Sequence, residues 1–163
     1  MTNPKGKAHG IVVGVDGSPS SLVALEWAAR QAELTGSKLQ AVAIWHWPAS
    51  FGYSALPDVD FDPAGEAGAM LEGAVELVRK THPDIEIQCT VAEGYAPHLL
   101  VELSREAELL VVGNRGHGEF VGMLVGSVSE HCVAHAHCPV LVLRGEGPSA
   151  PATNCVGGGT IGG

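Results

Sequence analysis

The sequence is poor in basic residues and has no apolar run long enough to cross a bilayer. Nine lysines and arginines stand against 18 aspartates and glutamates, which gives a net charge of −9. This balance disfavours nonspecific binding to nucleic acid, because such binding needs basic side chains to replace counterions. The short polar start, MTNPKGKAHG, lacks the apolar core of a secretory signal peptide. We therefore expect a cytoplasmic protein that binds neither nucleic acid nor membrane, although backbone N–H groups could still bind a small anion.

Cysteine is scarce too, and its placement argues against a disulfide framework. The chain has four cysteines, and none of them forms a CxxC pair. Cys89 and Cys132 fall in predicted regular elements, where we expect them to be small apolar residues. With 45% hydrophobic residues in 163, the chain can instead build a packed core in one domain.

Short apolar runs alternate with segments of helical periodicity along most of the chain. The strands are expected at 11–15, 39–45, 85–91, 109–113 and 140–144. The helices are expected at 19–35, 66–81, from 97 to about 107, and 127–137. The first of these helices has Ser18 as N-cap, Pro19 at its first position and Gly36 at its end. Residues 46–65 are expected to form a long loop, 1–9 a flexible leader, and the low-complexity 145–163 a disordered tail.

This alternation predicts a parallel sheet with helices on both faces. One topology with right-handed crossovers is a doubly wound sheet of order 3-2-1-4-5. Ligands bind such sheets beyond the carboxyl ends of the strands, where the winding reverses. That point lies between the first and fourth strands, so the turn at 16–18 and the loop after Gly113 should meet in one crevice.

Glycine is concentrated after the fourth strand. The segment GNRGHGEFVGMLVGS, at 113–127, contains five glycines and precedes a predicted helix. Glycine permits close backbone approach and positive φ, and a helix N-terminus offers free N–H groups, so together they could hold a phosphate. The segment has no Walker A lysine, and VGVDGSPSS does not match the dinucleotide fingerprint. The segment can also be interpreted without a ligand, because residues 127–130 match the capping box S-x-x-E and glycine loops also serve as connectors.

The glycine spacing resembles a known family. Gly113, Gly116, Gly126 and Ser127 fit the G-2x-G-9x-G-(S/T) motif of the ATP-binding universal stress proteins. IVVGVDGSPSS resembles that family's first strand and turn, while EAELLVVGNRGHG and CPVLVLR resemble its fourth and last strands. The resemblance covers about 10–144. It implies a three-layer α/β sandwich, adenine nucleotide alpha hydrolase-like, with an ATP site and a homodimer paired through Val140–Leu143.

The resemblance also assigns roles by position. Val15 and Asp16 would lie beside the base and ribose, the backbone of Ile44 would read the adenine edge, and Gly113 would contact the ribose. The phosphates would be contacted by Gly116, His117, Gly126, Ser127, Val128 and Ser129. Arg115 lies in the same loop and is expected to pair with phosphate.

The chain departs from the family pattern at a few positions. Asn114 stands where serine or threonine is frequent. Glu119 and Glu130 bring carboxylates near the expected phosphates and would repel them unless Mg²⁺ bridges the charges.

Other candidate residues can be interpreted either as functional or as purely structural. His131 and His135 are four residues apart, as in some zinc sites, but no second ligand pair accompanies them, so a solvated helix face is expected. His82 and His98 are expected at the surface with nothing special beside them. Trp45 and Trp47 could stack on a base, although Trp45 is expected to pack at the end of its strand and Trp47 to fold the long loop onto the body with Phe51 and Tyr53.

Three functions follow from these readings. The first is a stress protein that senses or sequesters ATP, with cyclic AMP (cAMP) as an alternative ligand. The second is a weak Mg²⁺-dependent ATPase, although no nucleophile–base pair stands out and the paired glycines of ATP-splitting synthetases are missing after the first strand. The third is an interaction protein in which the glycine loop binds nothing.

Overall fold

A single parallel sheet organises the chain. The computed structural model describes residues 10–47, 62–116 and 125–145. Its strands are β1 (Gly10–Gly14), β2 (Lys38–Trp45), β3 (Ile87–Glu93), β4 (Leu109–Gly113) and β5 (Val140–Leu143). Its helices are α1 (Pro19–Thr35), α2 (Pro63–Thr81), α3 (Ala96–Leu103) and α4 (Ser127–His135). The sheet has the order β3-β2-β1-β4-β5 with all pairs parallel, so the predicted order 3-2-1-4-5 is confirmed.

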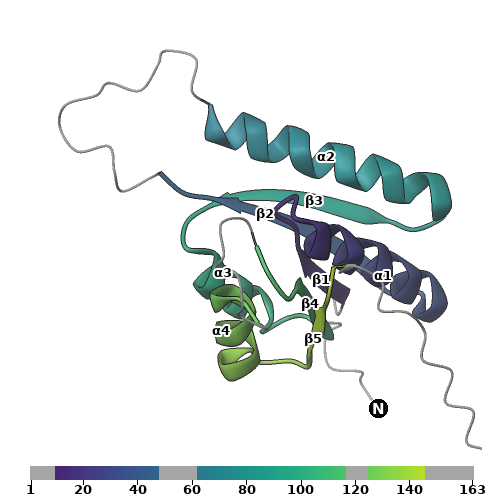
Figure 1. The fold of residues 1–163 in the computed structure, drawn as a ribbon. Helices are drawn as coiled ribbons and strands as arrows, with labels where there is room; N and C mark the ends of the chain where they lie inside the picture. Colours follow the sequence, from purple (N-terminus) through teal and green to yellow (C-terminus); the bar gives the residue numbers. More distant parts are fainter. Residues whose placement is uncertain (1–9, 48–61, 117–124, 146–163) are drawn as a thin grey trace, which may run out of the picture.

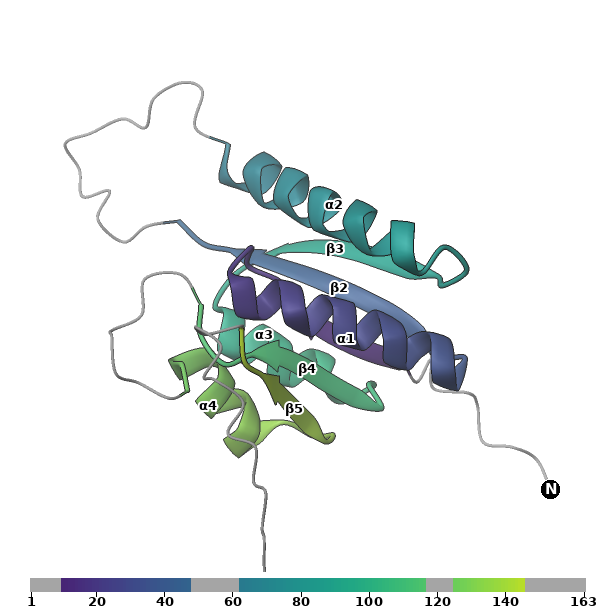
Figure 2. The same ribbon diagram turned by 45° about the vertical axis from the view of Figure 1, so that its right-hand side comes forward.

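Helices cover both faces of the sheet, which makes the predicted three-layer sandwich (Figure 1). Successive strand residues point to opposite faces. In β1, Val13 packs under α1 and α2, while Val12 packs toward α3 and α4. Turning the molecule shows α1 lying along β1 and β4, with α2 over β2 and β3 (Figure 2). Both faces of the central strands are therefore buried, as their continuous apolar runs require.

Local signals set the helix ends. Ser18 caps α1, its side chain accepting a hydrogen bond from the Ser21 N–H, and Gly36 ends the helix with a φ of 68°. Both features agree with the prediction. The predicted start of α2 at Glu66 is wrong, because Asp62 caps the helix and Pro63 occupies its first position. The prolines of that region obscured a standard helix start.

Two other predicted features need correction. Ser127 does not form a capping box with Glu130: the N-cap of α4 is Gly126, which has no side chain to cap the helix. Ser127 is thus the first helical residue rather than the cap. The third strand lies two residues later than predicted, since β3 pairs with β2 from Ile87 opposite Leu39 onward. β3 is an edge strand, as its alternating sequence indicated.

His82 is not the isolated surface residue expected from the sequence. Its side chain is only 11% exposed and lies between two glutamates of α1, with Nε2 3.0 Å from Glu26 Oε1 and Nδ1 2.7 Å from Glu33 Oε2. The hydrogen bonds to Glu33 and Glu26 raise the pKa of His82 above its ordinary value. Only the imidazolium can donate through both ring nitrogens, so its protonation joins the end of α2 to α1.

The His82 contribution to stability has a defined sign. A pKa raised in the folded state stabilises the protein fully below the unfolded value of about 6.5, and this stabilisation is lost as pH rises through the folded pKa. Acidification from neutral pH therefore strengthens the contact between α1 and α2.

The cysteines differ from one another in their burial. Cys132 lies in a regular element as predicted, the helix α4, where it is buried, and burial raises its pKa to about 11. Cys89 lies in a regular element as predicted, the edge strand β3, and is exposed there. Cys155 lies outside the described residues, as do the predicted leader and all of the predicted tail beyond Gly145. No helix of the described residues has the length and apolar character to traverse a membrane.

Candidate functional site

The two unusual loops meet at the carboxyl ends of β1 and β4, where the winding of the sheet reverses. A cavity of about 110 Å³ opens there. Its lining comes from three strands, from the starts of three helices and from the glycine-rich loop. The lining residues are Gly14, Val15, Asp16, Ser21, Val42, Ile44, Ala96, Leu100, Val112, Gly113, Arg115, Gly116, Val128 and Ser129. The crevice expected from the sheet order is therefore present.

The cavity has an apolar and a polar side. Ile44 and Val112 supply apolar side chains from the sheet, and Leu100 supplies another from α3. Asp16 and Arg115 lie on the polar side. A slot with apolar walls suits a flat heteroaromatic ring, and polar groups at one end suit the charged or hydroxylated remainder of a ligand.

Asp16 lines the cavity and also stabilises the turn that follows β1. Its Oδ1 accepts a hydrogen bond from the Ser18 N–H at 2.9 Å and another from the Ser18 hydroxyl. This is an Asx-turn. Gly17 between them has a φ of 81°, a conformation that favours glycine. The turn thereby fixes the direction of the Asp16 carboxylate at the end of β1.

The glycine-rich loop is tied to the first turn of α1 where it leaves β4. The Ser20 hydroxyl donates to the Arg115 carbonyl at 2.6 Å, and the Ser18 hydroxyl donates to the same oxygen at 3.2 Å. Ser18 is 3% exposed and Ser20 is 4% exposed, so these bonds are shielded from water. The loop backbone is thus held in place from α1.

The glycines have a packing reason that the sequence did not reveal. A Cβ on Gly113 would lie 2.8 Å from both the Ser20 carbonyl carbon and the Ser21 nitrogen. A Cβ on Gly116 would lie 2.8 Å from Asp16 Oδ2. Among the described residues only Gly17, Gly36 and Gly94 have positive φ, so Gly113 and Gly116 do not use this freedom of glycine. Gly113 is therefore needed for close approach to the backbone of α1, whereas Gly116 approaches the carboxylate of Asp16.

The far end of the loop returns to its beginning. The Gly126 N–H donates to the Asn114 carbonyl at 2.6 Å, and the Ser129 hydroxyl donates to the Gly113 carbonyl. The first turn of α4 therefore stands beside the end of β4. The N-cap Gly126 offers no side chain to the N-terminal N–H groups of α4, and these groups and the positive end of the helix dipole lie beside this region.

Eight of the eleven residues predicted for the site line the cavity. They are Val15, Asp16, Ile44, Gly113, Arg115, Gly116, Val128 and Ser129. Gly126 and Ser127 are at the cap and first position of α4 but are not among the lining residues. His117 and Glu119 lie outside the described residues.

Sequence reasoning missed the contribution of α3. Ala96 and Leu100 line the cavity one helical turn apart. Their spacing marks one face of a helix, but nothing local shows which strand ends that face covers. Val42 could have been found, because it precedes Ile44 by two residues and so shares its sheet face.

Rings gather near the cavity on α3 and α4. The Tyr95 and His98 rings are 5.0 Å apart, those of His98 and His131 are 5.4 Å apart, and those of His131 and His135 are 4.4 Å apart. The expectation that His98 has no special neighbour is therefore wrong. The described residues include no group of three or more His, Cys, Asp or Glu placed to hold a metal ion.

The tryptophans lie at the end of β2. Their rings meet edge to face, with centroids 5.7 Å apart. Trp45 is half-buried at the strand end, whereas Trp47 is 48% exposed. Phe51 and Tyr53, its expected partners, lie outside the described residues.

Comparison with known proteins gives one consistent result. The model of the universal stress protein family matches residues 8–144. The universal stress protein Rv1996 of Mycobacterium tuberculosis (strain H37Rv) is 34% identical over 157 residues, covering 84% of this chain and 48% of that protein. Rv2623 of the same strain is 35% identical over 149 residues, covering 87% of this chain and 50% of that protein. The chain spans about half the length of these curated relatives.

Solved structures with this fold include nucleotide complexes. A universal stress protein in complex with cAMP aligns with a TM-score of 0.65 and 28% identity, over 85% of this chain and 98% of that one. A universal stress protein from Archaeoglobus fulgidus in complex with dAMP aligns with a TM-score of 0.61 and 25% identity, over 83% of this chain and 97% of that one.

Proposed function

The chain belongs to the universal stress protein family, and from that premise we propose that it binds ATP in the crevice between β1 and β4. The observation that carries the proposal is the meeting of an apolar slot with the N-terminus of α4, whose N-cap is Gly126. The slot suits an adenine ring, and a helix N-terminus suits phosphate. Relatives in complex with cAMP and dAMP support an adenine nucleotide as the ligand class.

The proposed roles follow the geometry of the crevice. Ile44 and Leu100 would enclose the adenine, and Asp16 would accept hydrogen bonds from the base or ribose. The phosphates would lie between the loop backbone and the first turn of α4. Arg115 would supply charge there, in pairs with phosphate oxygens. The protein would sense or sequester nucleotide in the cytoplasm during stress.

Mg²⁺ is proposed to accompany the triphosphate. Glu130 lies in the first turn of α4, where a carboxylate would repel phosphate unless a cation stands between them. Removal of Mg²⁺ with a chelator is accordingly expected to weaken ATP binding.

Released ligand gives the most direct test. The protein, purified without added nucleotide and then unfolded, is expected to release about one ATP per chain, measured by mass spectrometry. Calorimetry should then show ATP binding with Mg²⁺, and Gly126→Val is expected to weaken it at least about tenfold by crowding the phosphates. Gly126 has a φ of −76° and a ψ of 164°, which valine can adopt, so the backbone need not be strained.

The matched control for that variant is Gly73→Val on α2, where an added Cβ meets nothing within 4 Å. The control should bind ATP like the wild type. Equal binding by Gly126→Val, or no binding by the wild type, would refute the ATP proposal.

cAMP is the second candidate ligand, and the solved cAMP complex of a relative is the reason to consider it. Its single phosphodiester would contact fewer groups of the loop than a triphosphate and would need no bridging cation. Recovery of cAMP instead of ATP from the unfolded protein would assign the site to a signalling nucleotide.

We also propose a homodimer through β5. Val140–Leu143 forms an edge strand of the sheet, and all four of its residues are half-buried in one chain. An edge strand can pair with another strand through its free N–H and C=O groups. Analytical ultracentrifugation should show a dimer that Val142→Pro dissociates, since the N–H of Val142 faces the open edge of the sheet, whereas that of Leu141 donates to β4. A monomer at every concentration would exclude this interface.

A further inference from the structure

The inference concerns a row of histidines that joins α3 to α4, called here the histidine row: His98, His131 and His135. His98 lies on α3, and the other two lie one turn apart on α4. The ring centroids are 5.4 Å apart across the helix pair and 4.4 Å apart along α4. Neutral imidazoles can pack at these distances. Protonation would place like charges at the same distances.

In the part of the chain that the structure describes, the surroundings of the row offer little to offset such charge. On α3, Glu102 lies toward His98 and His137 but is already paired with Arg105 at 2.9 Å. On α4, Glu130 adjoins His131 in sequence, and adjacent helical residues do not face each other. The strands beneath, β4 and β5, carry only apolar side chains and glycine. Burial raises the pKa values of Cys132 and Cys138, so both thiols stay neutral.

The direction in which the pKa of His131 is shifted agrees with this arrangement. Desolvation, followed by the charges of His135 and His98, lowers the pKa of His131. A lowered folded-state value means that the charged form is disfavoured in the folded protein. The contribution of His131 to stability is therefore present above the unfolded value of about 6.5 and is lost as pH falls below it.

The same helix pair supplies one wall of the nucleotide crevice. Leu100 comes from α3 and Val128 from α4, each within three residues of a histidine of the row. The two helices lie side by side on one face of the sheet (Figure 1). A separation of α3 from α4 would widen the crevice at this wall and reduce contact with the ligand.

We propose that the histidine row is an acid-sensitive latch, in which protonation of His98, His131 and His135 loosens α3 from α4 and so lowers the affinity of the crevice for nucleotide. The second half of this statement rests on the proposed function, whereas the first half concerns the protein alone. The latch would release nucleotide when the surrounding pH falls toward 5.5.

The test of the helix contact needs no ligand. Amide hydrogen exchange is measured at pH 7.5 and 5.5, and protection factors, which correct for the intrinsic effect of pH, are compared for α3, α4 and α1. We expect protection of α3 and α4 to fall about 3- to 10-fold at the lower pH, more at low salt than at high salt, while α1 keeps its protection. His98→Gln combined with His131→Gln should abolish the fall. Unchanged protection in the wild type, or an equal fall in the double variant, overturns the latch.

Binding is tested on the same two proteins. cAMP is the probe, because its phosphodiester keeps one charge across this pH range. Its affinity is expected to fall about 3- to 10-fold from pH 7.5 to 5.5 in the wild type and to stay level in the double variant. A constant or rising wild-type affinity overturns the link to the crevice. Absence of cAMP and ATP binding at either pH would refute the proposed function and this link together, while the exchange result would still decide the latch.

His82→Gln serves as the matched control. It removes a histidine that bridges α1 and α2, on the opposite face of the sheet. It should leave the pH response of α3 and α4 as in the wild type. Loss of that response in His82→Gln would overturn the assignment to the histidine row.

Discussion

Gly113→Ala is expected to destabilise the protein by about 3 kcal/mol, at the upper end of the cost of overpacking a tight site. The new Cβ would lie 2.8 Å from two backbone atoms of α1, and backbone cannot rotate away as a flexible side chain can. The strand and the helix would have to separate. Urea unfolding measures the change, and binding of ATP should weaken because the loop begins at this residue.

A second glycine on the same chain gives the control. Gly73 lies in the middle of α2 with nothing near its absent side chain, so Gly73→Ala is expected to stabilise the protein by about 0.5 to 1 kcal/mol through helix propensity. The two substitutions add the same methyl group with opposite expected signs. Similar effects from both would contradict the packing role assigned to Gly113.

Ala96→Trp is expected to reduce nucleotide affinity at least about 100-fold, or roughly 2.7 kcal/mol. Ala96 lines the crevice from the first position of α3, and an indole there would take up space that the nucleotide would otherwise fill. The fold should persist, because the added ring enters space open to a ligand rather than a packed core. Calorimetry with ATP and with cAMP measures the loss.

The control for this substitution is Ala69→Trp, at an exposed position of α2 on the opposite face of the sheet. It adds the same ring and should leave binding unchanged. If Ala96→Trp binds as tightly as the wild type and thermal melts confirm that it is folded, the crevice is not the nucleotide site.

The sheet order and the meeting of the two loops could be predicted because they follow from periodicity and handedness. Buried parallel strands read as apolar runs, and right-handed crossovers leave few topologies. The same reasoning located Asp16 and Gly113 at the ends of neighbouring strands.

Features that depend on contacts between distant segments could not be predicted. The wall formed by Leu100 requires knowing where α3 lies over the sheet. The burial of His82 depends on glutamates 49 and 56 residues away in the sequence. Ser127 matched a capping box, yet the hydrogen bond from Gly126 to Asn114 places the cap one residue earlier.

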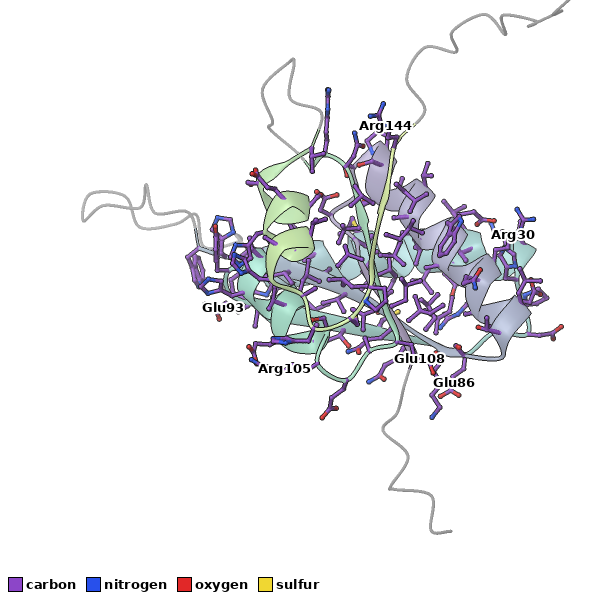
Figure 3. The ribbon with its side chains drawn as sticks, turned by 90° about the horizontal axis from the view of Figure 1, so that it is seen from below. Arg30, Glu86, Glu93, Arg105, Glu108 and Arg144 are labelled. Atoms are coloured by element: carbon purple, nitrogen blue, oxygen red, sulfur yellow. The ribbon has the colours of Figure 1, made fainter. Side chains whose placement is uncertain are left out.

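Charge lies mainly on the periphery of the molecule. Figure 3 shows Arg30, Glu86 and Glu108 projecting outward, away from the middle of the fold. The partly buried ionic contact of His82 and the histidine row lie on opposite faces of the sheet and respond to acid with opposite signs. Acidification would therefore strengthen one helix layer and weaken the other.

The hydroxyls of Ser18 and Ser20 carry a consequence for protein engineering. They hold the Arg115 carbonyl from a segment 95 and 97 residues earlier in the chain. A designer who grafts the glycine-rich loop onto another parallel sheet would therefore have to transfer the first turn of α1 with it. The portable unit is discontinuous, made of the turn at 16–21 and the loop beginning at Gly113. A graft of the loop alone would lack the serine hydroxyls that hydrogen-bond to its backbone.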